Sequence, residues 1–312
     1  MSADLEATPQ ATPTAAPQAA GADSTAVEPD AIDQQEASQA AELRAAAKTP
    51  RLSGARIWAL TWPKLLAVGI ALAIWQGVVL AGWKPPYVLP PPADVWTQLK
   101  ADMGTTEFWS ALATTLRRAV TGFALALLIG SVIGVAVARF RVLRAGVGSL
   151  ITGLQTMPSI AWFPLAVLLF GLSEQAILFV VVLGAGPSVA NGIISGIDHI
   201  QPQLLRVAGT LGAKGLRLYR YIVIPAALPS YVTGLKQGWA FAWRSLMAGE
   251  LIVNIAHRPS LGATLSNARD QSDAAQLVAT MIVILIVGMV VDALFTAADT
   301  RMRRRRGLLI DR

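Results

Sequence analysis

Residues 119–138 read AVTGFALALLIGSVIGVAVA, twenty positions without a charged side chain, and RFRVLR follows at 139–144. A helix needs about 20 consecutive apolar residues to cross the hydrocarbon core of a bilayer. Arginines at the end of such a run are typical of loops that stay in the cytoplasm. The stretch therefore predicts a membrane-spanning helix that leads into a short cytoplasmic loop.

Five further apolar runs of similar length predict a chain that crosses the membrane six times. Prolines within these runs predict kinks or breaks in their helices. The predicted fold class is therefore an all-α integral membrane protein with six transmembrane helices. The five runs are residues 65–83 (the first transmembrane helix, with Gln76), 150–170 (with Pro158 and Pro164), 176–197 (with Pro187 and Asn191), 228–252 (with Lys236, Arg244 and Glu250) and 276–298 (with Asp292).

The composition supports this class, because 54% of the 312 residues are hydrophobic and only 14% are charged. Soluble domains carry about 25% charged residues. Residues 1–50 hold eight of the 19 acidic residues but few aromatic or branched apolar side chains. Such a segment buries too little surface to fold, so we expect a disordered cytoplasmic tail, and it lacks the pattern of a secretory signal. The rest of the chain is strongly basic.

The basic residues lie at the ends of apolar runs, which favours membrane topology over nucleic-acid binding as their explanation. They occupy alternate loops, so both termini are predicted in the cytoplasm, with residues 300–312 as a basic tail. Arg117 and Arg118 are exceptions, and we expect them in an interfacial helix that holds them at headgroup level. The cytoplasmic groups are Lys48, Arg51, Arg56 and Lys64; Arg139, Arg141 and Arg144; Arg206, Lys214, Arg217 and Arg220; and Arg301 with residues 303–306.

Several kinds of chemistry are excluded by the residues themselves. There is no cysteine, His199 and His257 are the two histidines, and no Gly-Lys dipeptide exists for a phosphate-binding P-loop. We therefore expect no catalytic site, no metal and no cofactor in this chain.

The loop at residues 198–225 is amphipathic, since leucines alternate with Arg206, Lys214, Arg217 and Arg220. Gly209, Gly212 and Gly215 interrupt the pattern, which predicts two short helices joined by a turn. Pro225 suits the first turn of the helix that follows. The loop either lies on lipid headgroups or docks into a groove of a cytoplasmic partner.

This loop resembles the signature of the binding-protein-dependent ABC importer permeases, which is Glu-Ala-Ala, three residues, Gly, nine residues and Ile-x-Leu-Pro. Arg206 and Val207 stand where the family has Glu and its first Ala. The matching positions are Ala208, Gly212, Ile222, Ile224 and Pro225.

The resemblance extends over roughly residues 75–308 and is most similar to the sulfonate, taurine and nitrate permeases. The motifs that carry it follow in family order: YVLPPP at 87–92, TLRR at 115–118 with TGF at 121–123, MPSIAWFPL at 157–165, Pro187 with Asn191, Ala242 with Trp243, and ELI at 250–252.

The resemblance implies a type I ABC importer permease fold, with its ABC transmembrane type-1 domain at residues 110–299 and a coupling loop at 198–225. It also implies a cell (inner) membrane location, a second copy of the chain, a cytoplasmic ATP-binding subunit that hydrolyses ATP, and an extracytoplasmic solute-binding protein. The resemblance favours aliphatic sulfonates, including taurine, over nitrate as the substrate. Bicarbonate and thiamine precursors are the alternative substrates. The implied coupling residues are Arg206, Ala208, Gly209, Gly212, Ala213, Ile222 and Pro225.

The fifth run holds a cluster of ionisable and aromatic residues whose spacing places them on one helix face: Lys236, Trp239, Trp243 and Glu250. Ionisable groups inside a membrane usually face a cavity or a partner. The face either lines a pathway for a small anion or anchors the helix at the two interfaces.

Two hypotheses from other classes are weaker. A self-sufficient secondary transporter predicts inverted repeats with paired broken helices, and no second copy is visible. A membrane-embedded enzyme needs a catalytic cluster within its spans, and the sequence offers none.

Overall fold

The computed structural model describes residues 54–255 and 258–305, and these residues form helices without any strand. The all-helical prediction is therefore confirmed for the described part of the chain. The chain divides into two compact units, residues 1–68 and residues 69–312, and the helical bundle belongs to the second. The predicted tail at residues 1–50 and the last residues of the predicted basic tail lie outside the described residues.

Four helices in the described residues are long and apolar enough to cross a membrane, and the count is five if a bent helix pair forms one broken span and not a re-entrant loop. The four are residues Thr61–Leu80 of α2 (Gly54–Leu80), α4 (Thr106–Arg139), α7 (Glu174–Asp198) and Ala274–Arg304 of α12 (Ala274–Arg305). The bent pair joins α5 (Arg141–Thr156) to η1 (Ser159–Trp162) and α6 (Phe163–Phe170) at 105°.

The other long helix, α10 (Ile224–Ile252), covers the fifth predicted run but is not among these spans. Its three ionisable side chains are Lys236, Arg244 and Glu250. The count of six spans therefore stays a prediction that depends both on the bent pair and on α10.

Helix α4 is much longer than the apolar run that predicted it. It has 34 residues, and at about 1.5 Å per residue it is about 50 Å long. The helix begins at Thr106 because the Thr105 hydroxyl accepts a hydrogen bond from the Phe108 N–H at 3.2 Å. The expectation of a separate interfacial helix for Arg117 and Arg118 is wrong, because both lie inside α4 and Arg118 is only 1% exposed.

The prolines act in three different ways. The break expected near Pro158 is confirmed, since α5 ends before it and η1 follows. Pro164 lies in the first turn of α6, where its missing N–H costs nothing, so it starts a helix. Pro187 lies inside α7, which continues without a break.

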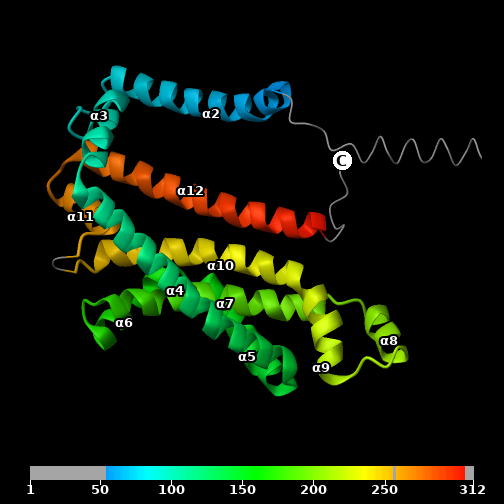
Figure 1. Cartoon of the computed structure of the whole chain (residues 1–312). Helices are drawn as coiled ribbons and strands as arrows, with labels where there is room; N and C mark the ends of the chain where they lie inside the picture. Colours follow the sequence, from blue (N-terminus) through cyan, green and yellow to red (C-terminus); the bar gives the residue numbers. More distant parts are fainter. Residues whose placement is uncertain (1–53, 256–257, 306–312) are drawn as a thin grey trace, which may run out of the picture. The chain divides into compact units, whose positions relative to one another are not determined.

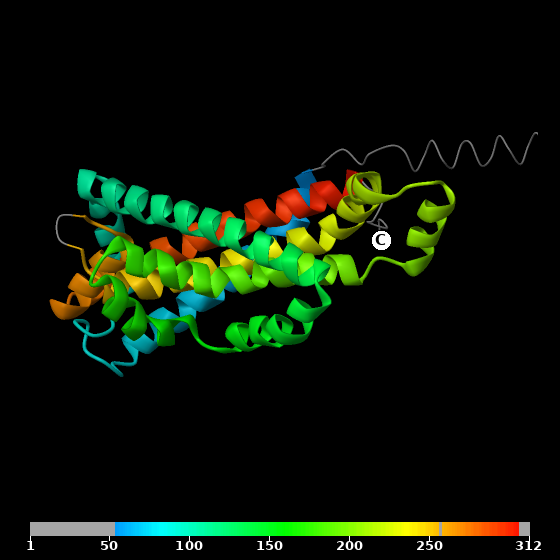
Figure 2. The ribbon, with the colours of Figure 1, turned by 90° about the horizontal axis from the view of Figure 1, so that it is seen from below.

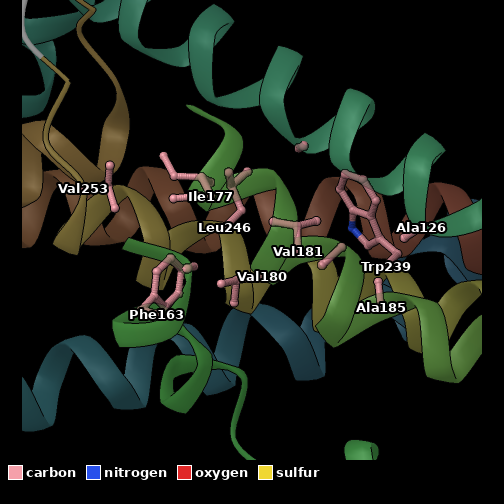
Figure 3. Packing of buried hydrophobic residues seen from close by; sticks show 13 residues of the cluster. Ala126, Phe163, Ile177, Val180, Val181, Ala185, Trp239, Leu246 and Val253 are labelled. Carbon is pink, nitrogen blue, oxygen red and sulfur yellow. The ribbon is translucent and has the colours of Figure 1, made fainter. Parts of the chain in front are cut away.

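Helix α7 is the centre of the bundle and packs against α4 and α10 (Figure 1). Its buried side chains meet those of α10 and α6 in one apolar cluster, which includes Phe163, Ile177, Val181 and Leu246 (Figure 3). Small residues let the backbones approach, as packing between membrane helices requires. A Cβ at Gly134 of α4 would lie 2.8 Å from the carbonyl oxygen of Ala190 in α7.

The second unit has two distinct ends. Helices α3 (Pro92–Met103), α6 and α11 (Leu261–Asp270) lie at one end. Helices α8 (Pro202–Thr210) and α9 (Gly215–Leu218) lie at the other end, and α8 projects beyond the long helices in both views (Figures 1 and 2).

Candidate functional site

The loop between α7 and α10 contains two short helices and a turn, as the glycine spacing predicted. Gly212 has a φ of +74°, in the left-handed region. The Ala213 N–H donates to the Ala208 carbonyl at 2.9 Å and the Gly212 N–H donates to the Gly209 carbonyl at 3.1 Å. This pair of bonds is a Schellman motif, which ends α8 and needs a left-handed residue where Gly212 stands.

The structure brings the seven predicted coupling residues to the same end of the bundle. Arg206, Ala208 and Gly209 belong to α8, and Gly212 and Ala213 form the turn. Ile222 lies in the π-helical turn η2 (Tyr219–Val223), and Pro225 in the first turn of α10.

The surface of this loop combines exposed leucines with exposed cations. Leu211 is 81% exposed and Leu216 is 82% exposed. Within the described residues, no ion pair or hydrogen bond holds the side chain of Arg206, Lys214, Arg217 or Arg220. Exposed apolar side chains among polar ones mark an interaction surface.

Three of the four residues of the α10 face lie together against α12. The Lys236 ammonium donates to the Thr296 hydroxyl at 2.8 Å and lies 3.5 Å from the Asp292 carboxylate. Trp239 and Trp243 stack with ring centroids 6.3 Å apart. Trp239 also packs against Phe123 of α4 and Phe295 of α12.

Trp239 and Trp243 line an open pocket of about 650 Å³ between α10 and α12. Most of its lining is apolar, with Arg244 and Asp292 as the charged exceptions. The pocket could receive an apolar body beside two charged groups.

Glu250 does not line this pocket and is fully buried near the carboxyl end of α10. Its carboxylate accepts hydrogen bonds from Arg118 Nη1 at 2.9 Å, Thr115 Oγ1 at 2.8 Å and the Gly262 N–H at 3.1 Å. In the described structure this side chain joins α10 to α4 and α11.

A second carboxylate, Glu174 at the start of α7, extends the charged cluster. It forms ion pairs with Arg117, at 3.2 Å, and with Arg258, and it lies 3.9 Å from Arg118 Nε. Arg118 Nε and Nη2 have no hydrogen-bond partner in the described residues. One buried guanidinium therefore lies between two carboxylates.

Sequence reasoning missed Arg118 as the partner of Glu250. The sequence did contain one indication, because a charge inside an apolar helix must be paired or face a cavity. The pairing itself could not be read, since 132 residues separate the two side chains.

No group of three or more His, Cys, Asp or Glu side chains in the described residues could hold a metal ion.

The comparison with known families agrees with this arrangement of helices and loop. Residues 112–304 match the family described as binding-protein-dependent transport system inner membrane component. This chain belongs to that family. The match includes α7, the α8–α9 loop, α10 and nearly all of α12.

Two relatives illustrate the family. A putative ABC transporter permease protein of Methanocaldococcus jannaschii is 30% identical over 73% of this chain and 86% of its own length. The taurine transport system permease protein of Escherichia coli is 28% identical over 78% of this chain and 91% of its own length. Both similarities cover most of each protein.

A solved structure of a bacterial alginate ABC transporter has the same fold. It has a TM-score of 0.53 and 13% identity, over 80% of this chain and 98% of the other. The type I permease fold predicted from the sequence is therefore supported at the level of helix arrangement.

Proposed function

We propose that this chain is the membrane-spanning subunit of an ATP-driven importer for a small anion, with aliphatic sulfonates such as taurine as the substrate class. One observation carries the proposal: the exposed two-helix loop around Gly212 projects from the bundle within the segment that matches the family. The relative from Escherichia coli, named as a taurine permease, supports the substrate class.

The loop is the proposed coupling element to a cytoplasmic ATP-binding subunit. Leu211 and Leu216 offer apolar surface for a groove, and the neighbouring cations offer contacts to acidic groups. ATP hydrolysis is assigned to that partner. A second copy of this chain and an extracytoplasmic solute-binding protein complete the proposed assembly.

The proposed topology has six spans with both termini in the cytoplasm, and α10 is the fifth of them in chain order. Neighbours compensate two of its three charges, because Glu250 pairs with Arg118 and Lys236 lies near Asp292, while Arg244 lies over the Phe241 ring. Pairing lowers the cost of ionisable groups inside a bilayer.

The α10 face is the proposed lining of the pathway. Trp239 and Trp243 line the pocket between α10 and α12, and Lys236 lies at its edge, where it donates to Thr296. Glu250 is sealed in the described structure, so it joins the pathway only if α4 and α10 separate there.

Co-purification of the ATP-binding subunit with the permease tests the proposal. Gly212→Asp places a side chain in a left-handed position of the docking turn, which strains the backbone, so ATPase recovery should fall at least about tenfold, the effect of 1.4 kcal/mol. Gly171→Asp is a strict control, since Gly171 also has a positive φ (+68°) and open space but follows α6 at the other end, and its ψ of −168° makes a side chain more strained there than at Gly212.

Equal ATPase recovery with wild type and Gly212→Asp, together with intact transport, would refute the coupling role. Lipid binding by the loop predicts that result, because an added carboxylate then weakens only contacts with headgroups.

A further inference from the structure

A second pocket, of about 360 Å³, lies between α7 and α10 at the end of the bundle that carries the α8–α9 loop. Arg303 of α12 borders it. Its lining differs from that of the pocket beside Trp239 and Trp243, called the tryptophan pocket below. Almost every side chain that lines the second pocket is polar, and none is a large apolar one. The residues on which the inference rests are Asn191, Ser195, Ser230, Gln237 and Arg303.

Two glycines create this polar cleft. A Cβ at Gly192 of α7 would lie 2.9 Å from the Cα of Gly234 in α10, and a Cβ at Gly234 would lie 2.6 Å from the Cα of Gly192. The two backbones therefore touch at this point. No side chain fits between the two glycines. The space beside them is open and is lined by the polar side chains named above.

The polar cleft contains hydrogen-bonding groups without protein partners. In the part of the chain that the structure describes, the side chains of Asn191, Ser195, Ser230 and Gln237 make no hydrogen bond. Asn191, Ser195 and Ser230 are half-buried and Gln237 is exposed, so their polar groups can bond water or a polar ligand that enters the cleft.

The donors of the polar cleft suit an oxyanion. Arg303 borders the cleft and forms an ion pair with Asp299, which lies outside the lining, with Nε 2.9 Å from each carboxylate oxygen. Nη2 donates to Thr233 at 3.1 Å, and Nη1, which makes no hydrogen bond within the described residues, is left as a donor for an anion. Side-chain amides and hydroxyls beside it add donors for oxygen acceptors.

We propose that this polar cleft binds a compact oxyanion, of the size of a short sulfonate or bicarbonate. The inference rests on the proposed function and deepens it, because the cleft lies at the proposed cytoplasmic end, where the transported anion leaves. The lining has no large apolar side chain to pack against a long alkyl chain, so short hydrophilic sulfonates should bind more tightly than long alkanesulfonates.

Thermal unfolding of the purified permease–ATPase complex, without the solute-binding protein, measures this binding. The probes are taurine, methanesulfonate and bicarbonate, with octanesulfonate as the long-chain comparison and short-chain phosphatidylglycerol as the lipid comparison. A ligand that binds the folded complex raises its Tm in a concentration-dependent way.

Gln237→Glu is the informative variant, since Gln237 is exposed and an added carboxylate there repels an anion. The half-saturating concentration of the bound oxyanion should rise at least about tenfold, a change of 1.4 kcal/mol. Asn191→Leu, of similar size but without donors, should act in the same direction. Gln271→Glu makes the same charge change at the end of α11, on the opposite end of the bundle, and should shift binding less than about twofold.

The inference is overturned if none of the three compact oxyanions raises the Tm, or if Gln237→Glu and Gln271→Glu behave alike. A Tm increase that depends on Gln237 but occurs only with phosphatidylglycerol also overturns it, because the cleft is then a headgroup site. Recovery of the ATPase in the same preparations reports separately on the proposed function, which can stand when the anion site fails.

Discussion

Arg118 and Glu250 show how single residues hold the bundle together. Arg118 is 1% exposed and Glu250 fully buried, and a 2.9 Å hydrogen bond joins them. A buried ion pair contributes little net stability, but removing one partner leaves an uncompensated charge in a low-dielectric interior. The pair is therefore a point where a single substitution has a large effect.

Arg118→Ala should destabilise the protein by about 3–5 kcal/mol, since it leaves the Glu250 carboxylate buried without its cation. Denaturant unfolding in detergent measures the change. Arg117→Ala is the control, because the neighbouring exposed pair with Glu174 is worth at most about 1 kcal/mol. The double variant Arg118→Ala with Glu250→Ala should recover part of the loss in stability. Equal losses from Arg118→Ala and Arg117→Ala would argue against the buried charge as the cause.

Lys236 and Trp243 test the pathway proposal at the same scale. Lys236→Ala removes a cation near the rim of the tryptophan pocket, and Trp243→Ala removes part of its wall. Both variants should lower ATP-driven uptake of taurine while assembly with the ATPase stays normal. Lys236→Arg keeps the charge and should retain more uptake than Lys236→Ala. Normal transport by both alanine variants would leave the face with a structural role.

At the scale of elements, the α8–α9 loop and α10 differ in what stabilises them. The turn between α8 and α9 depends on a local feature, the left-handed Gly212 with its two backbone hydrogen bonds. Two charges of helix α10 depend on its neighbours, since Lys236 and Glu250 have partners on α4, α11 and α12. The loop and the extent of α10 can therefore be read from short stretches of sequence, whereas the partners of these two charges cannot.

Leu211 and Leu216 should supply most of the apolar contact of the loop with the ATPase. Burial of a leucine side chain is worth about 1.5–3 kcal/mol, so each alanine substitution should weaken the complex by about tenfold or more. Affinity measurements with the purified ATPase test this. Leu168→Ala is the matched control, because Leu168 of α6 is also 82% exposed but lies at the other end. Equal losses from Leu168→Ala and Leu216→Ala would contradict a specific contact.

At the scale of the whole molecule, the distribution of charge decides orientation in the membrane. Basic residues gather at the end that carries the α8–α9 loop, and the carboxyl end of α12 lies there as well (Figure 1). The turn between α3 and α4 lies at the opposite end. The positive-inside rule then predicts that the loop end lies in the cytoplasm.

Reporter fusions test this orientation. A reporter joined after Thr105, in the turn between α3 and α4, should report the extracytoplasmic side, and one at the carboxyl terminus the cytoplasm. Alkaline phosphatase and a fluorescent protein give opposite activities in the two compartments. The same compartment for both fusion sites would require an even number of crossings between them and would reject the six-span topology.

The sequence by itself determined the helical membrane class, the positions of most long helices and the turn at Gly212. These features are local, because the length of an apolar run and the φ that a glycine permits depend on neighbours along the chain. Only the tertiary structure decided the length of α4, the pairing of Arg118 with Glu250 and the polar cleft between α7 and α10. Each of these needs side chains or backbones from distant segments to meet, and no spacing along one helix specifies which distant residue comes within 3 Å.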